Sequence, residues 1–282
     1  MAGRIFWFAR LPRTLATVLA GAALAVSGAV IQSVLTNKLA SPGIIGVNAG
    51  AGLAVTICCA VGAVSGWAIA GAAFSGALLA VLLVTLTARK IGASRTTVIL
   101  GGVAINSFLN SASEAITTLV PEAGVQSADF RVGGFSSVAY TRLIPAGVLI
   151  VVGLLVIFTL CNELDVMSLG EDTAQGLGLS VKKMRTIFLG IAALLAGATV
   201  SFAGLLGFVG LIVPHLGRRI AGSESRHLLP FCAVFGAGFV TICDLIARTL
   251  FAPYEIAVGI LMSFIGGPFF IFLLLNKKGG RV

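Results

Sequence analysis

A run of polar side chains interrupts an apolar stretch in the first half of the chain, and it includes the carboxylate Glu114. Residues three or four apart share one face of a helix, so these side chains form a polar stripe. Facing lipid would be costly, and we expect the stripe to face protein or a water-filled path. A ladder of hydrogen bonds between helices is the alternative. The stripe contains Asn106, Ser107, Asn110, Ser111, Ser113, Glu114, Thr117 and Thr118.

A second polar region, residues 168–185, lies between two charge-free runs. It begins with the acidic pair Glu171 and Asp172 and ends with a basic cluster at 182–185. This polarity suits a short helix, because acids stabilise the N-terminal end of a helix dipole and bases its C-terminal end. Such a structured insert in a membrane protein indicates docking to a cytosolic partner.

The elements that must hold these residues are membrane spans. Of 282 residues, 58% are hydrophobic and 10% charged, and the mean hydropathy is +1.08. The charge-free runs match a bilayer core, which takes about 20 helical residues. With a turn at Gly62–Gly66, they predict an all-α bundle of about nine spans in a single transmembrane domain over 1–282. The runs are Thr14–Asn37, Leu39–Ala88, Thr96–Ser113, Leu143–Asn162, Thr186–Gly217, His227–Cys243 and Ile256–Asn276.

Charge and missing motifs narrow the function. Lys and Arg gather on one side when the 168–185 insert is placed in the cytosol, which is the orientation that the positive-inside rule favours. The net charge of +9 is then mostly inner-face charge, and no nucleic-acid partner is needed. There is no P-loop, catalytic triad or metal-ligand cluster, and the five cysteines have no C-x-x-C spacing. Any ATP that drives transport would have to be bound by another subunit.

The N-terminal residues MAGRIFWFARLPR do not resemble a signal peptide, since no apolar core precedes their basic residues. In this orientation Arg4, Arg10 and Arg13 lie outside. That is unusual for a basic N-terminus. Either a preceding span is missing from this chain or these arginines have a role on the outer side.

Two similar segments indicate an internal repeat. LAGAALAVSG at Leu19–Gly28 and LAGATVSFAG at Leu195–Gly204 share their glycine spacing but run in opposite directions. This predicts inverted repeats, about 14–119 and 183–276, as in many transporters; a chance match between Ala/Gly-rich helices is the alternative. Asp244 and Arg248 have i,i+4 spacing, and mutual neutralisation is the simple interpretation.

Several segments together resemble the FecCD-type permeases of bacterial ABC importers for ferric siderophores, haem and cobalamin. The similarity extends over nearly the whole chain from Ala9. It is carried by Ala9–Ala54, SLGEDTAQGLGLSV at Ser168–Val181, GFVGLIVPHLGRRIAG at Gly207–Gly222, Leu228–Phe239 and Asp244–Leu275.

The resemblance implies an inverted-repeat type II importer permease in the bacterial cytoplasmic membrane, acting as a homodimer or as a heterodimer with a paralogue. Two ABC ATPase subunits would bind ATP and Mg²⁺ below it, so this subunit would hold no cofactor. An extracytoplasmic substrate-binding protein would dock above it. Relatives have ten spans, and their R-L-P-R segment follows the first; here it is Arg10–Arg13. The first span is therefore expected to be missing.

The resemblance also implies site residues. The ATPase-coupling loop, 168–182, would act through Gly170, Glu171, Asp172, Ala174, Gly176, Leu177, Gly178 and Leu179. Arg10, Arg13 and Arg248 would contact the binding protein. Ser94, Thr96 and Thr97 would form the cytosolic gate. Asn106, Asn110, Ser113, Glu114 and Thr117 would line the pathway, although Glu114 is no fixed family motif.

The predicted function is thus import of an iron–siderophore complex or related iron chelate, driven by a separate ATPase, with no enzymatic site in this chain. Haem or cobalamin import by the same mechanism is the first alternative. An ion-coupled secondary transporter that uses Glu114 is a less favoured one, because it leaves the 168–185 insert unexplained. The sequence does not identify the substrate.

Overall fold

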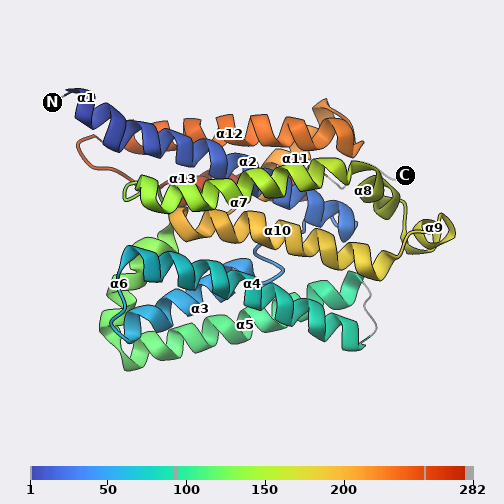
Figure 1. Cartoon of the computed structure of the whole chain (residues 1–282), viewed down its shortest axis with the longest axis horizontal. Coiled ribbons are helices and arrows are strands. Elements are labelled where there is room, and N and C mark those ends of the chain that lie inside the picture. Colours follow the sequence, from blue (N-terminus) through green and yellow to red (C-terminus); the bar gives the residue numbers. More distant parts are fainter. Residues whose placement is uncertain (1, 92–94, 251, 277–282) are drawn as a thin grey trace.

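A computed structural model describes residues 2–91, 95–250 and 252–276 (Figure 1), and every regular element in these ranges is helical. In chain order the elements are α1 (Ala2–Ile5), the π-helix η1 (Phe6–Arg10), α2 (Leu11–Val34), α3 (Val47–Ala60), α4 (Gly66–Ile91), α5 (Arg95–Leu119), α6 (Pro121–Val132), α7 (Tyr140–Thr159), α8 (Cys161–Ser168), α9 (Glu171–Gly176), α10 (Val181–Ala203), α11 (Val209–Ile220), α12 (Ser225–Thr249) and α13 (Val258–Asn276).

The long helices run along one common direction, with α6 at one end of the bundle and α9 projecting from the other (Figure 1). Helix α2 packs against α12 and α10, α10 packs against α4, and α3 packs against α4 and α5. The centre of the bundle is therefore formed by α2 and α10. The two elements that bear the polar candidate residues, α5 and α9, lie at its edge and at its end.

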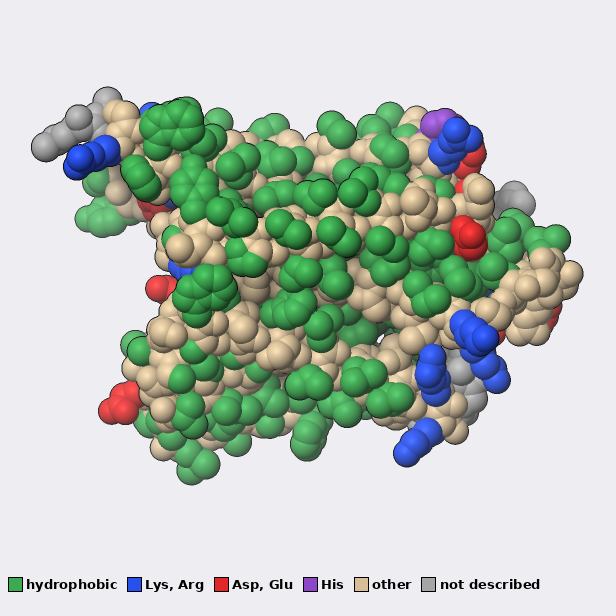
Figure 2. Space-filling model, in the orientation of Figure 1, with side chains coloured by type: hydrophobic (Ala, Val, Ile, Leu, Met, Phe, Trp, Pro, Cys, Tyr) green, Lys and Arg blue, Asp and Glu red, His purple; other side chains and the backbone are tan. Residues whose placement is uncertain are grey.

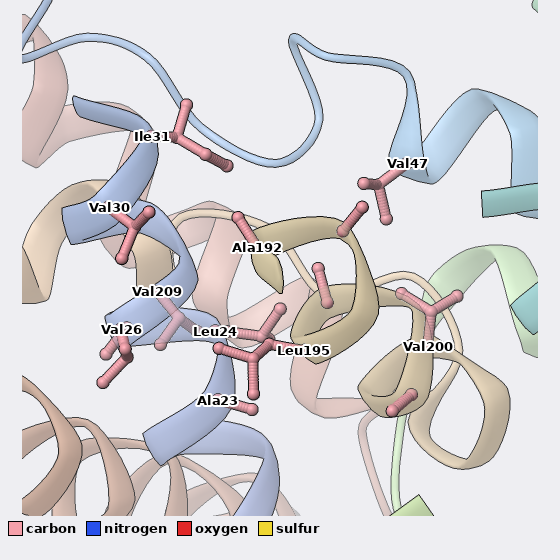
Figure 3. Close-up of a cluster of buried hydrophobic side chains, with 14 of the residues drawn as sticks. Ala23, Leu24, Val26, Val30, Ile31, Val47, Ala192, Leu195, Val200 and Val209 are labelled. Carbon is pink, nitrogen blue, oxygen red and sulfur yellow. The ribbon is translucent and has the colours of Figure 1, made fainter. Parts of the chain in front are cut away.

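The core is made of small side chains. Ala16, Ala20 and Ala23 of α2 are fully buried, and so are Ala192 and Ala196 of α10. Figure 3 shows side chains of α2 and α10, among them Leu24 and Leu195, gathered between the two helices. Lipid is as apolar as a protein core, so helices in a membrane gain most from close packing, which small residues permit.

The surface is apolar between two charged ends. Figure 2 shows hydrophobic side chains over the middle of the visible face and charged side chains near both ends. Five helices of the described residues are long and apolar enough to cross a membrane: the continuous N-terminal helix over Gly3–Val34, Gly66–Lys90, Tyr140–Thr159, Val181–Ala203 and Ser225–Thr249. The helices Val47–Ala60 and Val258–Phe272 are apolar but shorter.

The expected helical segments agree with the structure. Residues 39–88 fold back between Ala60 and Gly66, where the turn was expected, and the run 186–217 divides into α10 and α11. Two elements are additional. Helix α6 and helix α8 are short and have no charge-free run to reveal them. In the two predicted halves, α2 would correspond to α10 and α4 to α12. The contact of α2 with α12 then has its counterpart in the contact of α10 with α4. The repeat itself stays a prediction.

Close backbone contacts hold α2 to its neighbours. A Cβ atom on Gly21 would lie 2.1 Å from the carbonyl oxygen of Gly236 in α12. A Cβ atom on Gly28 would lie 2.1 Å from the carbonyl oxygen of Gly210 in α11. Real Cβ atoms do not approach backbone so closely, so any larger residue would force these helices apart.

We therefore expect Gly21→Ala to destabilise the fold by about 1–3 kcal/mol, because α2 and α12 must separate to admit the methyl group. Gly190→Ala in α10 is the matched control, since a Cβ atom there would meet nothing within 4 Å. Thermal unfolding in detergent would measure both. An equal melting temperature for the two variants would contradict the proposed α2–α12 packing constraint.

Candidate coupling and translocation site

Within the 168–182 segment, Glu171–Gly176 folds into a short helix, α9, at the tip of the molecule (Figure 1). The acidic pair begins this helix as predicted, but the basic cluster at 182–185 lies in the first turns of α10 instead of at the end of α9. Gly170 has φ +120° and Gly178 has φ +83°, conformations that other residues rarely adopt. They turn the chain into and out of α9. The N–H of Leu179 donates to the carbonyl of Ala174 at 3.0 Å, and Ala174 is fully buried. The tip is thus an ordered structure packed on the bundle.

The outer surface of the tip combines apolar and small residues. Leu169 and Leu177 are 63% and 64% exposed, and Asp172 is also exposed. Side chains added at Gly176 or Gly178 would meet nothing within 4 Å. Exposed leucines at the charged end of a membrane protein indicate a surface that another protein covers.

Glu171 faces the body of the protein instead. Its carboxylate accepts a hydrogen bond from Arg185 of α10, and its Oε1 lies 3.5 Å from Nε of Arg95, the first residue of α5. Arg95 also donates to the carbonyl of Met167 in α8 at 3.3 Å and to the hydroxyl of Thr36, just after α2. This residue of the predicted coupling loop therefore connects the tip with α5 and α10.

The helix before the tip, α8, contacts α12 through a residue that no sequence pattern indicated. Asp165 of α8 accepts hydrogen bonds from the backbone N–H of Ser225 at 2.9 Å and from its hydroxyl at 2.6 Å. Ser225 is the first residue of α12, so Asp165 satisfies one of the free N–H groups at that helix end. Residues 60 positions apart in the chain meet here, a proximity that local pattern does not encode.

The predicted gate residues lie at the start of α5, near the tip. Thr96 is exposed and Thr97 half-buried in the first turn of this helix. Ser94 lies outside the described residues. Arg95, which the sequence prediction omitted, connects this end of α5 with Glu171 of the tip and with Met167 of α8.

The polar stripe of α5 divides into a bonded part and an exposed part. Asn106 donates to the carbonyls of Gly43 and Ile44, at 2.8 and 3.1 Å, and the hydroxyl of Ser113 lies 2.9 Å from that of Thr56 in α3. These contacts match the hydrogen-bond ladder. Thr117 donates to the carbonyl of Glu114, within α5 itself. The remaining stripe residues are exposed: Ser107, Asn110, Ser111, Glu114 and Thr118.

Arg131 of α6 joins this network and borders a cavity. Its guanidinium donates to the hydroxyls of Ser113 and Thr56, so one cation connects α3, α5 and α6. It also lines a cavity of about 520 Å³ together with Val132, Leu205, Gly207, Gly259, Ile260, Ser263, Phe264 and Pro268. Phe264 of α13 is 75% exposed. No pattern in the sequence predicted this cavity.

At the opposite end, Arg13 is engaged within the protein. Its Nη2 donates to Oδ1 of Asp244 and its Nη1 to Oε2 of Glu255, each at 2.9 Å. The interpretation of Asp244 and Arg248 as a mutually neutralising pair was wrong, because Asp244 pairs with Arg13 of α2, 231 residues away. Nε of Arg248 is buried and has no hydrogen-bond partner.

The other predicted docking arginines differ in their surroundings. Arg10 ends the π-helix η1 and is exposed, and Arg248 is half-buried. The Arg13 side chain is 15% exposed and already pairs with two carboxylates. Of the three, Arg10 is therefore the most accessible to a partner at this end of the protein.

Comparison with known proteins identifies the family to which this chain is similar. Residues 1–276 match the model of the FecCD transport family. A permease protein of the Fe(3+)-citrate import system of Bacillus subtilis is 38% identical over 270 residues, 96% of this chain and 80% of the relative. The vitamin B12 import permease of Shigella sonnei is 36% identical over 283 residues, 99% of this chain and 86% of the relative.

A solved structure agrees with the sequence relatives. The inward-facing conformation of a metal-chelate type ABC transporter matches with a TM-score of 0.91 at 28% identity, covering 97% of this chain and 88% of that one. The all-helical fold with its apolar helices is thus that of a metal-chelate type ABC transporter permease. The chain is a multi-pass membrane protein and belongs to the FecCD transport family.

Proposed function

We propose that this chain is the permease subunit of a bacterial ABC importer that carries a ferric chelate across the cytoplasmic membrane. The observation that carries the proposal is the combination of an ordered tip with exposed leucines and a long helix, α5, with an exposed polar face. Two ATPase subunits, which hold ATP and Mg²⁺, cover the tip. A substrate-binding protein docks at the other end, where Arg10 is exposed.

The polar face of α5 supports a second permease copy. Asn110 and Glu114 are exposed on a span-length helix, and exposing amide and carboxylate groups to lipid costs several kcal/mol. Covering this face with a second copy, or with a paralogue, removes that cost. The cavity beside Arg131 lies among α6, α13 and the loop before α11. A pathway between two copies would then be lined by polar and aromatic side chains of each.

The relatives support the substrate class. A similar chain belongs to a Fe(3+)-citrate import system, and others belong to iron(3+)-hydroxamate and hemin systems. We therefore favour an iron chelate, with haem or cobalamin import as the alternative. The relatives do not favour the ion-coupled alternative, and Glu114, the carboxylate that it would use, is exposed beside other polar groups.

Leu177→Glu should weaken binding of the ATPase by tenfold or more, because a central apolar contact of an interface costs over about 1.4 kcal/mol when lost. Ile220→Glu at the end of α11 is the control, since Ile220 is 67% exposed but lies outside the tip. Co-purification of the co-expressed ATPase measures the effect. Equal retention of ATPase by both variants would mean that the tip is not the docking surface.

Glu114→Gln separates ATP-driven from ion-driven transport. We expect uptake of ⁵⁵Fe-labelled ferric citrate, ferric hydroxamate or haem to change less than about twofold, because the amide keeps the polar character of an exposed position. Uptake should also require ATP inside the vesicles. Complete loss of uptake in the variant, or uptake without ATP in the unmodified protein, would favour the secondary-transport alternative.

A further inference from the structure

One carboxylate at the inner end of the bundle serves two cations. Oε1 of Glu171 accepts a hydrogen bond from Arg185 and lies 3.5 Å from Nε of Arg95. The exposed fractions of the three side chains are 5% for Arg185, 21% for Arg95 and 34% for Glu171. The cluster is thus partly shielded from water, and both arginines share the carboxylate of Glu171.

The two arginines belong to parts of the protein with different tasks. Arg185 is in the first turns of α10, which packs against α2, α4 and α7 in the centre of the bundle. Arg95 begins α5, the helix with the exposed polar face. Glu171 begins α9, the helix of the tip. Through this carboxylate the tip contacts both the fixed centre and the helix beside the proposed pathway.

The two contacts differ in strength. Arg185 makes a charge-assisted hydrogen bond with Glu171, a strong type of contact. Nε of Arg95 is buried but makes no hydrogen bond, so its attraction to Glu171 is purely ionic. Partly exposed ion pairs of this kind are weak. A small displacement of α9 would therefore break the Arg95 contact before the Arg185 contact.

We propose that the Arg95–Glu171 ion pair is a breakable tie between the tip and α5 that favours the conformation described here. Displacement of α9 by the ATPase breaks this ion pair and leaves the inner end of α5 held by the hydrogen bonds from Arg95 to Thr36 and Met167, so that it moves more easily. A contact made in only one of two conformations shifts their equilibrium by its own free energy. The assignment of α9 as the ATPase contact rests on the proposed function.

The test compares four permease variants in complex with the ATPase, reconstituted in liposomes: Arg95→Gln, Arg95→Lys, Glu171→Gln and the double variant Arg95→Gln/Glu171→Gln. Arg89→Gln is the matched control. Arg89 ends α4 at the same end of the bundle and donates to Thr186 of α10 at 2.7 Å, away from Glu171. The rate of ATP hydrolysis without binding protein is measured, together with the amount of ATPase retained per permease.

We expect Arg95→Gln to raise this basal hydrolysis about two- to fivefold, because a weak ion pair biases the equilibrium by that factor. Arg95→Lys should restore the unmodified rate, since a lysine keeps the ionic attraction. In the Glu171→Gln background, Arg95→Gln should have a smaller effect, because only the hydrogen bonds to Thr36 and Met167 are then lost. Retention of the ATPase should equal that of the control in every Arg95 variant.

Three results would overturn the tie. Arg95→Gln could behave like Arg89→Gln, it could act equally in both backgrounds, or it could lose the ATPase, which would make Arg95 a docking residue. The proposed function fails separately: the unmodified chain would then retain no ATPase. A complex that assembles and hydrolyses ATP normally, with an unaltered Arg95→Gln rate, rejects only the tie.

Discussion

Close contact between backbones is the constraint on which the rest of this structure depends. Hydrophobic burial gives little drive for one apolar helix to leave lipid for another, so association relies on packing. Gly21 against Gly236 and Gly28 against Gly210 bring α12 and α11 to within backbone distance of α2. Fully buried alanines fill the remaining space between α2 and α10. These contacts fix α11 and α12 against α2.

Because the centre of the bundle is packed with small side chains, the polar groups lie on an outer helix and at the two ends of the bundle. The exposed polar side chains of the stripe lie on α5, at the edge of the bundle. The charged groups gather at the two ends (Figure 2). At one end Arg13 joins α2 to α12 through Asp244, and at the other Glu171 joins α9 to α10 and α5. Ion pairs thus fasten helix ends where water is near, while glycine and alanine fasten the middle.

The sequence predicted the helical class and the fold-back at Gly62–Gly66 from the lengths of the charge-free runs. It also predicted a short helix that begins with the acidic pair 171–172, but the basic residues expected at its end belong to α10. It did not predict which groups meet across the fold. Asp244 has Arg248 one turn away, yet it pairs with Arg13, and Asp165 bonds the start of α12. Partners such as these are fixed by the packing of helices distant in sequence. Local spacing therefore misidentified one pair and missed another.

The contacts of the tip bear on whether the ATPase acts on the membrane helices or the membrane helices act on the ATPase. The tip contacts α10 and α5 through Glu171, and α8, the helix before it, contacts α12 through Asp165. The tip is therefore sensitive to the arrangement of both halves of the chain. Coupling between two sites is reciprocal by thermodynamic necessity. If the ATPase moves the membrane helices through the tip, a movement of those helices must also act on the ATPase through the same contacts. Binding of substrate at the opposite end of the permease would then change the rate of ATP hydrolysis through the permease itself, without a separate regulator.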